Sequence, residues 1–198
     1  MPYAVTLDSD NALVSLEEAK QFINKDLNDQ TEDNKILQYI NSASSLCNSL
    51  THRKLKARDL TEYYSGDGSN TLMLNNYPIN SIASIYDDLD RTYGADTLID
   101  NSDYAIMPTN LAFKVIYDGG VFMKGIRNIK ITYNAGYSTI PWDLREACLE
   151  LVGFFWMNTE EKRFGILSIN LGDGSVRIDT TQIPKSVLQI LEAYRKKW

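Results

Sequence analysis

Histidine and cysteine are scarce in this chain: its 198 residues include one histidine and two cysteines. Zinc sites are built from clustered Cys and His side chains, often as Cys-x-x-Cys pairs, and no such pair occurs. Cys47 and Cys148 fall on the apolar faces of expected helices, where a free cysteine behaves as a small core residue. The sequence therefore predicts no metal site, and no other cofactor is indicated.

Long apolar runs and a surplus of basic residues are also missing. No window approaches the roughly 18 uninterrupted apolar residues of a membrane-spanning helix, and the first residues do not have the pattern of a signal peptide. We therefore expect a cytosolic chain without a membrane partner. The net charge of −6 argues against a surface that grips nucleic acid, because such surfaces are basic. An acidic surface would repel the phosphates of a DNA duplex and let the duplex pass without binding it.

Motifs that carry catalysis are absent as well. The Gly-x-Gly pairs that begin at Gly66 and Gly172 lack the third glycine of a dinucleotide fingerprint, and no Gly-Lys-Ser/Thr phosphate loop occurs. The single His52 has no nucleophile motif beside it. The acidic stretch from Asp87 to Asp103 begins with a predicted turn at 87–91 and lacks the spacing of an EF-hand, so a solvated acidic loop is expected there in preference to a calcium site. We expect no catalytic residues.

Helical periodicity is present at both ends of the chain. Ser15 and Glu18 have the spacing of a capping box, and Thr31 is expected to cap the next helix. Apolar residues at helical spacing predict four helices, in about 15–27, 31–51, 142–157 and 184–198.

Between the second and third helices the pattern changes to short strands and turns. The segments 62–65 and 71–74 are expected to pair as a hairpin around Gly66–Asn70. A loop or hairpin is expected in 165–179. Further strands are expected at 78–86, 104–107, 112–117 and 129–133.

These elements predict an α+β fold, a small helical bundle of about four helices with an antiparallel β insertion between the second and third helices. The expected organisation is one chain unit over 1–198, with a helical core in 12–56 and 140–198 and the β insertion in 57–139.

The third helix is the most apolar of the chain. Its first two turns are amphipathic, but after Glu150 the polar face fades, because Gly153, Phe154 and Met157 occupy it and Trp156 lies at its margin. A helix that is apolar nearly all round needs cover on more than one side. One side can be the protein's own core and the other a neighbouring copy. Phe154, Trp156 and Met157 are therefore the candidate subunit interface.

The most basic stretch of the chain follows the second helix. Phosphate binding is one interpretation, and a solvated group of cations at a helix C-terminus is the more ordinary one. The possible DNA-proximal residues are Arg53, Lys54, Lys56 and Arg58.

Eight short motifs in this order give the chain a family resemblance. It resembles the head–tail connector (adaptor) proteins of tailed double-stranded DNA bacteriophages, in the branch with a β insertion between helices. The motifs are Ser15-Leu-Glu-Glu-Ala19, Thr51-His-Arg-Lys-Leu55, Tyr64-Ser-Gly-Asp-Gly68, Leu72-Met-Leu74, Pro78-Ile-Asn-Ser-Ile82, Ile131-Thr-Tyr-Asn-Ala-Gly-Tyr137, Pro141-Trp-Asp-Leu-Arg-Glu-Ala147 and Ile183-Pro-Lys-Ser-Val-Leu-Gln-Ile-Leu-Glu-Ala-Tyr-Arg195.

This resemblance implies a virion structural protein without catalytic activity. Members of the family form a ring, commonly of twelve copies, beneath the portal vertex, extend the DNA channel and provide a docking platform. The implied partners are other copies of the chain, the portal protein and a head-completion (stopper) or tail protein. DNA would pass through the channel without sequence-specific binding. The implied location is the head–tail interface of the virion, reached from the host cytoplasm during assembly.

The last helix is the candidate portal contact, because the C-terminal segment of the family often reaches toward the portal. Truncation before Pro184 is expected to abolish portal binding while preserving the fold, because little of the β segment should depend on the last helix. Packing of the helix on the chain's own core is the alternative. The candidate contact residues are Leu188, Leu191, Tyr194, Arg195 and Trp198.

Two other classes of function compete with the connector. The main alternative is a non-catalytic carbohydrate- or ligand-binding β module, in which some of the twelve tyrosines stack on sugars. A hydrolase with paired acidic residues is the more distant one. Glycan binding by a monomer that does not bind the portal would favour the binding module. Hydrolytic activity would be needed to support the hydrolase.

Overall fold

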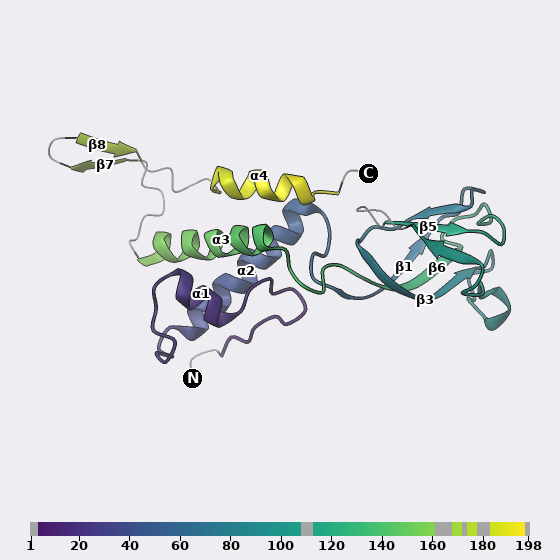
Figure 1. The fold of residues 1–198 in the computed structure, drawn as a ribbon, viewed down its shortest axis with the longest axis horizontal. Coiled ribbons are helices and arrows are strands. Elements are labelled where there is room, and N and C mark those ends of the chain that lie inside the picture. The colour runs from purple at the N-terminus through teal and green to yellow at the C-terminus, as the bar shows by residue number, and fades with distance from the viewer. Residues whose placement is uncertain (1–3, 108–112, 161–167, 172–173, 178–182, 197–198) are drawn as a thin grey trace. The chain divides into compact units, whose positions relative to one another are not determined.

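The computed structural model describes residues 4–107, 113–160, 168–171, 174–177 and 183–196 (Figure 1). The chain forms two compact units. Residues 1–53 and 140–198 make up the helical unit, and residues 54–139 make up the β unit. The organisation expected from the sequence, one chain unit with a helical core in 12–56 and 140–198 and a β insertion in 57–139, stays a prediction. No helix within the described residues is both long and apolar enough to cross a membrane.

The described part of the helical unit contains four helices and a separate hairpin. Together with the antiparallel sheets of the β unit, they confirm the predicted α+β class. The elements are α1 (Leu16–Phe22), α2 (Asp33–Thr51), α3 (Trp142–Glu160), α4 (Lys185–Tyr194), and the paired strands β7 (Ser168–Leu171) and β8 (Gly174–Arg177).

The core of the helical unit forms around the inner face of α3. Of the stripe that helical spacing predicts, Phe155 is half-buried. The other five residues, Leu144, Ala147, Cys148, Leu151 and Val152, are fully buried, and α3 packs against α1, α2 and α4. Burial of one leucine side chain stabilises a fold by about 1.5–3 kcal/mol, so this stripe fixes α3 in the unit. The partner side chains in the core include Ala19, Ile36, Ile40, Ala43, Cys47, Val187 and Leu191.

Helix α1 starts as predicted and ends early. The amide of Glu18 donates to Ser15 Oγ at 3.2 Å, and the amide of Ser15 donates to Glu18 Oε2 at 2.7 Å, which confirms the capping box. The helix ends at Phe22 because Asn24 has a left-handed φ of 55°. The amide of the next residue then bonds back to the last turn, an arrangement typical of helix C-termini. Leu27, which was expected in the buried stripe, is exposed.

A buried lysine organises the connection from α1 to α2. Lys20 Nζ donates to the carbonyl oxygens of Leu27, at 3.3 Å, and Asp29, at 2.7 Å, and pairs with Asp33 at 2.5 Å. The predicted cap by Thr31 is wrong. Its amide donates to Asp29 Oδ1 at 2.9 Å within the preceding turn, and α2 begins after Glu32 without a side-chain cap.

The β unit contains two antiparallel three-stranded sheets, in the orders β1-β6-β3 and β2-β5-β4. In β6, side chains alternate strictly between buried and part-buried positions, so the sheet has one core face and one outer face. The unit is built from β1 (Arg58–Tyr64), β2 (Thr71–Met73), β3 (Ile79–Asp87), the 3-10 turn η1 (Ala95–Thr97), β4 (Tyr104–Ile106), β5 (Lys114–Tyr117) and β6 (Ile129–Ala135).

The predicted hairpin around Gly66–Asn70 is wrong. Strand β1 pairs along its whole length with β6, from Arg58 opposite Ala135 to Tyr64 opposite Ile129, and β2 pairs with β5. The turn therefore carries the chain from one sheet to the other. The predicted pairing used only local turn chemistry, whereas the observed partners lie 40 or more positions further along the chain.

Several tyrosines of the β unit belong to its interior. Tyr77 and Tyr133 are buried, and the hydroxyls of Tyr64 and Tyr133 both donate to Glu62 Oε2. Burial raises the pKa of both Tyr64 and Tyr133, because the charged phenolate is poorly solvated there. These side chains support the core and are not free to stack on a sugar.

Candidate assembly surfaces

The outer side of α3 carries an apolar groove of about 550 Å³. Met157 at its edge is 56% exposed and Phe22 is 39% exposed. Gly153 allows the close approach of α1, because a Cβ built at this position would lie 2.9 Å from Phe22 Cε1. We call this the α3 groove. Its lining residues are Phe22, Ile23, Asn24, Glu150, Gly153, Phe154, Trp156, Met157 and Pro184.

Two of the three candidate interface residues lie on this groove with accessible side chains. Met157 is exposed, and Phe154 is half-buried with its ring centroid 6.0 Å from that of Phe155. Trp156 must be corrected, because it is only 8% exposed. Its indole packs edge-on against Tyr39 at 6.4 Å and under the Lys25 ammonium at 4.7 Å. It therefore serves the protomer's own packing.

Helix α4 packs on the core of its own unit, as the alternative interpretation held. Val187 is fully buried and Leu191 is 2% exposed. The hydroxyl of Tyr194 bonds the Asp143 carboxylate at 2.7 Å, and the Arg53 guanidinium donates to the Tyr194 carbonyl. Leu191 is therefore corrected from a portal contact to a core residue. Truncation before Pro184 would remove part of this core and would not preserve the fold.

The other candidate residues for the portal contact are more accessible than Leu191 where the structure describes them. Leu188 is 43% exposed and Arg195 is exposed, whereas Tyr194 is half-buried. Trp198 lies outside the described residues. Leu188 in α4 and Arg195 directly after it also border a hollow shared with His52, the residue that follows α2.

The predicted basic patch does not form a set of solvated cations. Arg53 is 4% exposed and is engaged with α4. Lys54 is exposed, and Lys56 and Arg58 are half-buried. Because Arg53 belongs to the helical unit and the other three to the β unit, the DNA-proximal role stays a prediction and does not include Arg53.

The acidic stretch is the expected solvated loop only in part: Asp90, Asp96 and Asp100 are exposed, but its first two aspartates are not. Asp87 and Asp88 are buried. The Asp88 carboxylate accepts the amides of Asp90, Thr92 and Tyr93 and the Thr92 hydroxyl, at 2.6–2.8 Å. These bonds hold the pKa of Asp88 below its usual range, because they stabilise the charged form. Residues 88–93 therefore form an ordered turn. No metal-binding cluster was found among the described residues.

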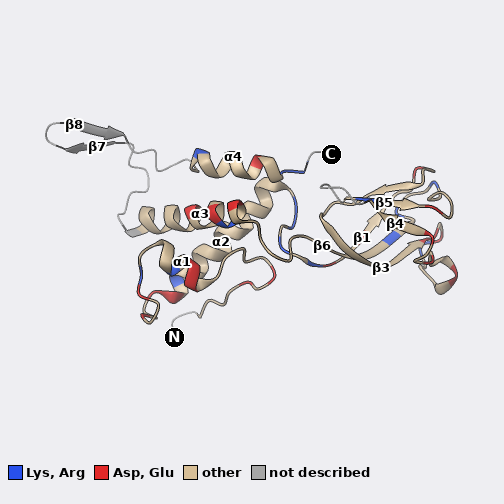
Figure 2. Ribbon diagram, viewed as in Figure 1, with Lys and Arg blue, Asp and Glu red and all other residues tan. Residues whose placement is uncertain are grey.

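An aromatic and acidic strip along α3 was not singled out from the sequence. Trp142 is 82% exposed, and the Arg145 guanidinium lies 5.0 Å from its ring. Glu146, also exposed, is one turn further along, and Glu150 another turn along at the α3 groove. Figure 2 shows acidic positions of α3 in red along its ribbon. Helical phase could have revealed the strip, because all three lie opposite the buried stripe.

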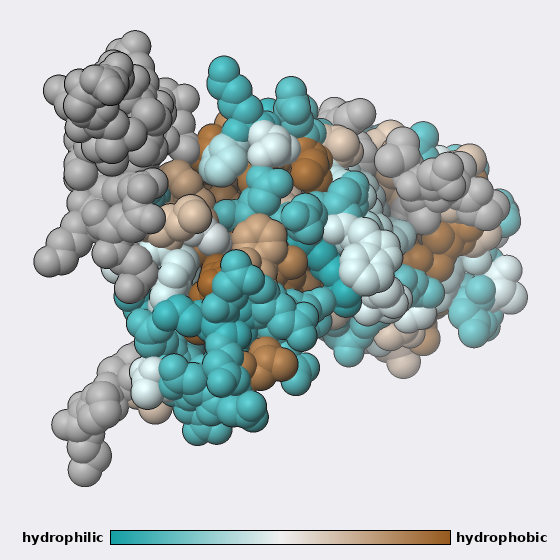
Figure 3. Space-filling model, turned by 60° about the vertical axis from the view of Figure 1, so that its left-hand side comes forward, coloured by the Kyte–Doolittle hydropathy of each residue, from teal (hydrophilic) through white to brown (hydrophobic). Residues whose placement is uncertain are grey.

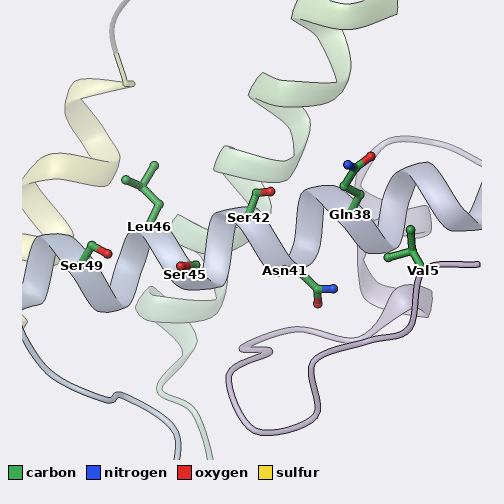
Figure 4. A pocket seen from close by; sticks show the side chains of 7 residues that line it. All are labelled: Val5, Gln38, Asn41, Ser42, Ser45, Leu46 and Ser49. Atoms are coloured by element: carbon green, nitrogen blue, oxygen red, sulfur yellow. The ribbon is translucent and has the colours of Figure 1, made fainter. Parts of the chain in front are cut away.

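Other surfaces of the helical unit are more polar. On α2 a hollow is lined by Gln38, Asn41, Ser42, Ser45 and Ser49, together with Val5 and Leu46 (Figure 4). The N-terminal segment lies along α2, and asparagine side chains of this helix accept hydrogen bonds from the backbone of the segment. Val5 N bonds Asn34 Oδ1 at 3.2 Å, and Asp8 N bonds Asn41 Oδ1 at 2.9 Å. Across the described part of the chain, apolar surface appears as brown areas among polar side chains (Figure 3).

Exposed apolar surface on a folded, well-packed protomer is typical of a protein that functions within an assembly. Comparison with known proteins agrees with that class. A family model described as "Head completion protein" matches residues 12–197, so the chain belongs to the head completion protein family. It is thus a structural protein of a phage-type virion that acts as a head–tail adaptor. A structural family of this kind implies a non-enzymatic role.

Solved structures share the fold at low sequence identity. A chain in the neck of an empty gene transfer agent (GTA) particle, computed with C6 symmetry, matches with a TM-score of 0.63 and 16% identity, over 99% of this chain and 95% of that one. A chain in the virion of the native GTA particle matches with a TM-score of 0.65, 16% identity and the same coverage. A chain in the neck of the native GTA particle, computed with C12 symmetry, matches with a TM-score of 0.62 and 16% identity, over 100% of this chain and 96% of that one. No curated protein matches the chain.

Proposed function

We propose that the protein closes into a ring of about twelve copies beneath the portal vertex and extends the DNA channel. The ring would also provide the docking platform for the next head-completion or tail protein. Membership of the head completion family supports this proposal, as does the fold shared with chains of particle necks computed with C6 and C12 symmetry. The observation that carries it is the α3 groove, where the apolar side chains of Phe22 and Met157 are exposed among the described residues.

The remaining parts of the proposal follow from charge and exposure. DNA passes the ring without sequence-specific binding, because a chain with a net charge of −6 repels phosphates overall. The portal is contacted by the outer face of α4, through Leu188 and Arg195. The protein is made and assembled in the host cytoplasm and stays in the virion at the head–tail interface.

The direct experiment mixes the purified protein with purified portal from the same phage. Electron microscopy is expected to show a closed ring of chains on one end of the portal. Native mass spectrometry would count the copies. A protein that stays monomeric and shows no binding to the portal would contradict the proposal.

Two substitutions in α4 separate its core side from its outer side. Leu191→Ala is expected to lower the free energy of unfolding by about 2–5 kcal/mol, because it leaves a cavity in the core. Leu188→Asp is expected to change stability by less than about 1 kcal/mol, because the side chain is exposed, and to weaken portal binding measured by calorimetry. Gln189→Asp on the same helix is the matched control. Equal portal affinity for Leu188→Asp and wild type would remove α4 from the portal contact.

A further inference from the structure

The β unit presents apolar side chains on loops at one end of its first sheet. Ile126 is 78% exposed, Leu89 is 54% exposed and Met123 is 42% exposed. The two loops touch, because a Cβ built at Gly125 would lie 2.9 Å from Leu89 Cδ2. We call the surface formed by 88–93 and 121–127 the β tip. Among the described residues of the β unit, it forms an exposed apolar patch.

A buried polar clamp holds the β tip in one shape. Asn128, 1% exposed, donates to Asp87 Oδ1 at 2.7 Å and to the Met123 carbonyl at 2.8 Å. It also accepts the Gly66 amide at 2.9 Å, and the second Asp87 oxygen accepts the Met123 amide at 2.6 Å. Because the loops are held in place before binding, little conformational entropy is lost when a partner docks.

Two cations stand beside these apolar residues. Arg127 lies over the Tyr63 ring at 5.3 Å, and Lys130 lies 5.5 Å from the rings of both Tyr86 and Tyr93. The salt bridges of the described residues include neither cation. Arg and Tyr are the side chains that most often anchor protein interfaces. The β tip, with Lys130 of β6 beside it, therefore offers apolar contact and two positive charges that form no salt bridge among the described residues.

The backbone of the β tip is strained at the residues of this cluster. Tyr93 and Arg127 have left-handed φ values of 54° and 52°, and the Tyr93 hydroxyl donates to the Arg127 carbonyl at 2.6 Å. Non-glycine residues adopt this conformation at a cost, and such sites are often functional. The strain therefore adds to the case that the side chains are placed for contact.

The outer side of α3 carries charge of the opposite sign beside its own apolar surface. Trp142, Glu146, Glu150, Gly153 and Met157 are spaced by four, four, three and four residues, so they lie on one face of the helix. Its first half is acidic, and its second half is the α3 groove. Neither glutamate forms a salt bridge among the described residues.

We propose that the β tip of one copy docks on the outer side of α3 of the next copy. Leu89 and Ile126 enter the α3 groove, and Arg127 and Lys130 face Glu146 and Glu150. This inference rests on the proposed ring, which needs two different and mutually complementary surfaces on every copy. The match of apolar with apolar surface and of cations with carboxylates identifies a second copy as the occupant. The hollow on α2 complements the outer side of α3 less well than the β tip does, because its lining contains no cation to face the two glutamates (Figure 4).

Charge reversal with compensation tests the pairing. Arg127→Glu/Lys130→Glu and Glu146→Lys/Glu150→Lys are each expected to reduce the yield of rings on the portal by roughly tenfold or more. The chain with all four changes is expected to recover ring closure, because the charges are complementary again. Glu17→Lys/Asp96→Lys, at exposed sites off both surfaces, is the control for changed net charge. Circular dichroism and thermal melting would verify that each variant folds.

The outcomes separate this inference from the proposed function. Normal rings from either double variant, or no recovery from the fourfold variant when all variants fold, would overturn the pairing and leave the ring intact. Absence of rings from the wild type would overturn the proposed function itself. A second measurement uses Ile126→Cys/Met157→Cys under oxidation on the portal. A ladder of cross-linked chains is expected, whereas cross-links confined to single chains would also overturn the pairing.

Discussion

Met157→Asp is expected to abolish ring closure on the portal while the protomer stays folded. The side chain is 56% exposed, so the aspartate is solvated in the isolated chain and costs little stability there. In a ring, the same carboxylate would be buried in an apolar contact without a partner. Leaving a charge buried and unpaired costs about 3–5 kcal/mol, which is a loss of roughly a hundredfold or more in affinity at every interface. Electron microscopy of variant and portal, with wild type in parallel, measures the effect.

Two variants make this result specific. Leu98→Asp places the same charge at a leucine of the β unit that is 47% exposed and lies outside the α3 groove, and its rings should be normal. Phe154→Asp should also prevent ring closure. It should cost more stability than Met157→Asp, because Phe154 is half-buried. Normal rings from Met157→Asp would show that the groove is not a subunit contact.

The second large effect is expected on stability, at Asn128 in the β unit. Asn128→Leu keeps the volume of the side chain and removes all three of its hydrogen bonds. Asp87, the Gly66 amide and the Met123 carbonyl would then lose a buried partner. An unsatisfied buried group costs about 1–3 kcal/mol, so we expect a loss of roughly 3–5 kcal/mol in the unfolding of the β unit. Urea denaturation followed by tyrosine fluorescence measures it.

Asn134→Leu is the matched control for Asn128→Leu. Asn134 lies in β6 on the outer face of the sheet, where its amide bonds Asp59 at 2.8 Å in contact with solvent. Water can replace that bond, so a change below about 1 kcal/mol is expected. If Asn128→Leu proved as mild as the control, the clamp would not be what holds the loops of the β tip.

The helical elements were predictable from the sequence because their signals are local. The capping box at Ser15 and Glu18 forms as the spacing indicates, and the apolar stripe of α3 faces the core. Pairing of the strands was not predictable in the same way. Gly66–Asn70 has the composition of a hairpin turn, but β6 offers β1 a partner along seven residues, and this longer ladder replaces the local one.

The candidate assembly site was predicted in part. The loss of polar residues after Glu150 indicated a contact surface, and Met157 lies on the α3 groove. Trp156 and Leu191 were assigned to contacts because they are large and apolar, yet the fold buries both. Which apolar residue of a helix stays outside depends on the neighbours that pack on it, and sequence alone does not give them.

The β tip has almost no sequence signal, because its apolar residues lie on two loops, with Leu89 more than 30 positions before Met123 and Ile126. The Asp87–Asn128 clamp that joins them is a contact across 41 positions. The turn formed by Asp88 is the exception. An aspartate followed by residues whose amides can reach its carboxylate is a known turn signal, and the turn predicted at 87–91 is confirmed by the bonds of Asp88.

The central claim is that the α3 groove, open in the protomer, is covered when copies assemble. The most direct measurement is an electron-microscopy map of the ring on its portal, at a resolution that shows side chains. We predict that the groove around Met157 is filled by the adjacent copy at every interface. A ring in which that groove faces solvent, or a chain that never leaves the monomeric state in the presence of portal, would contradict the account.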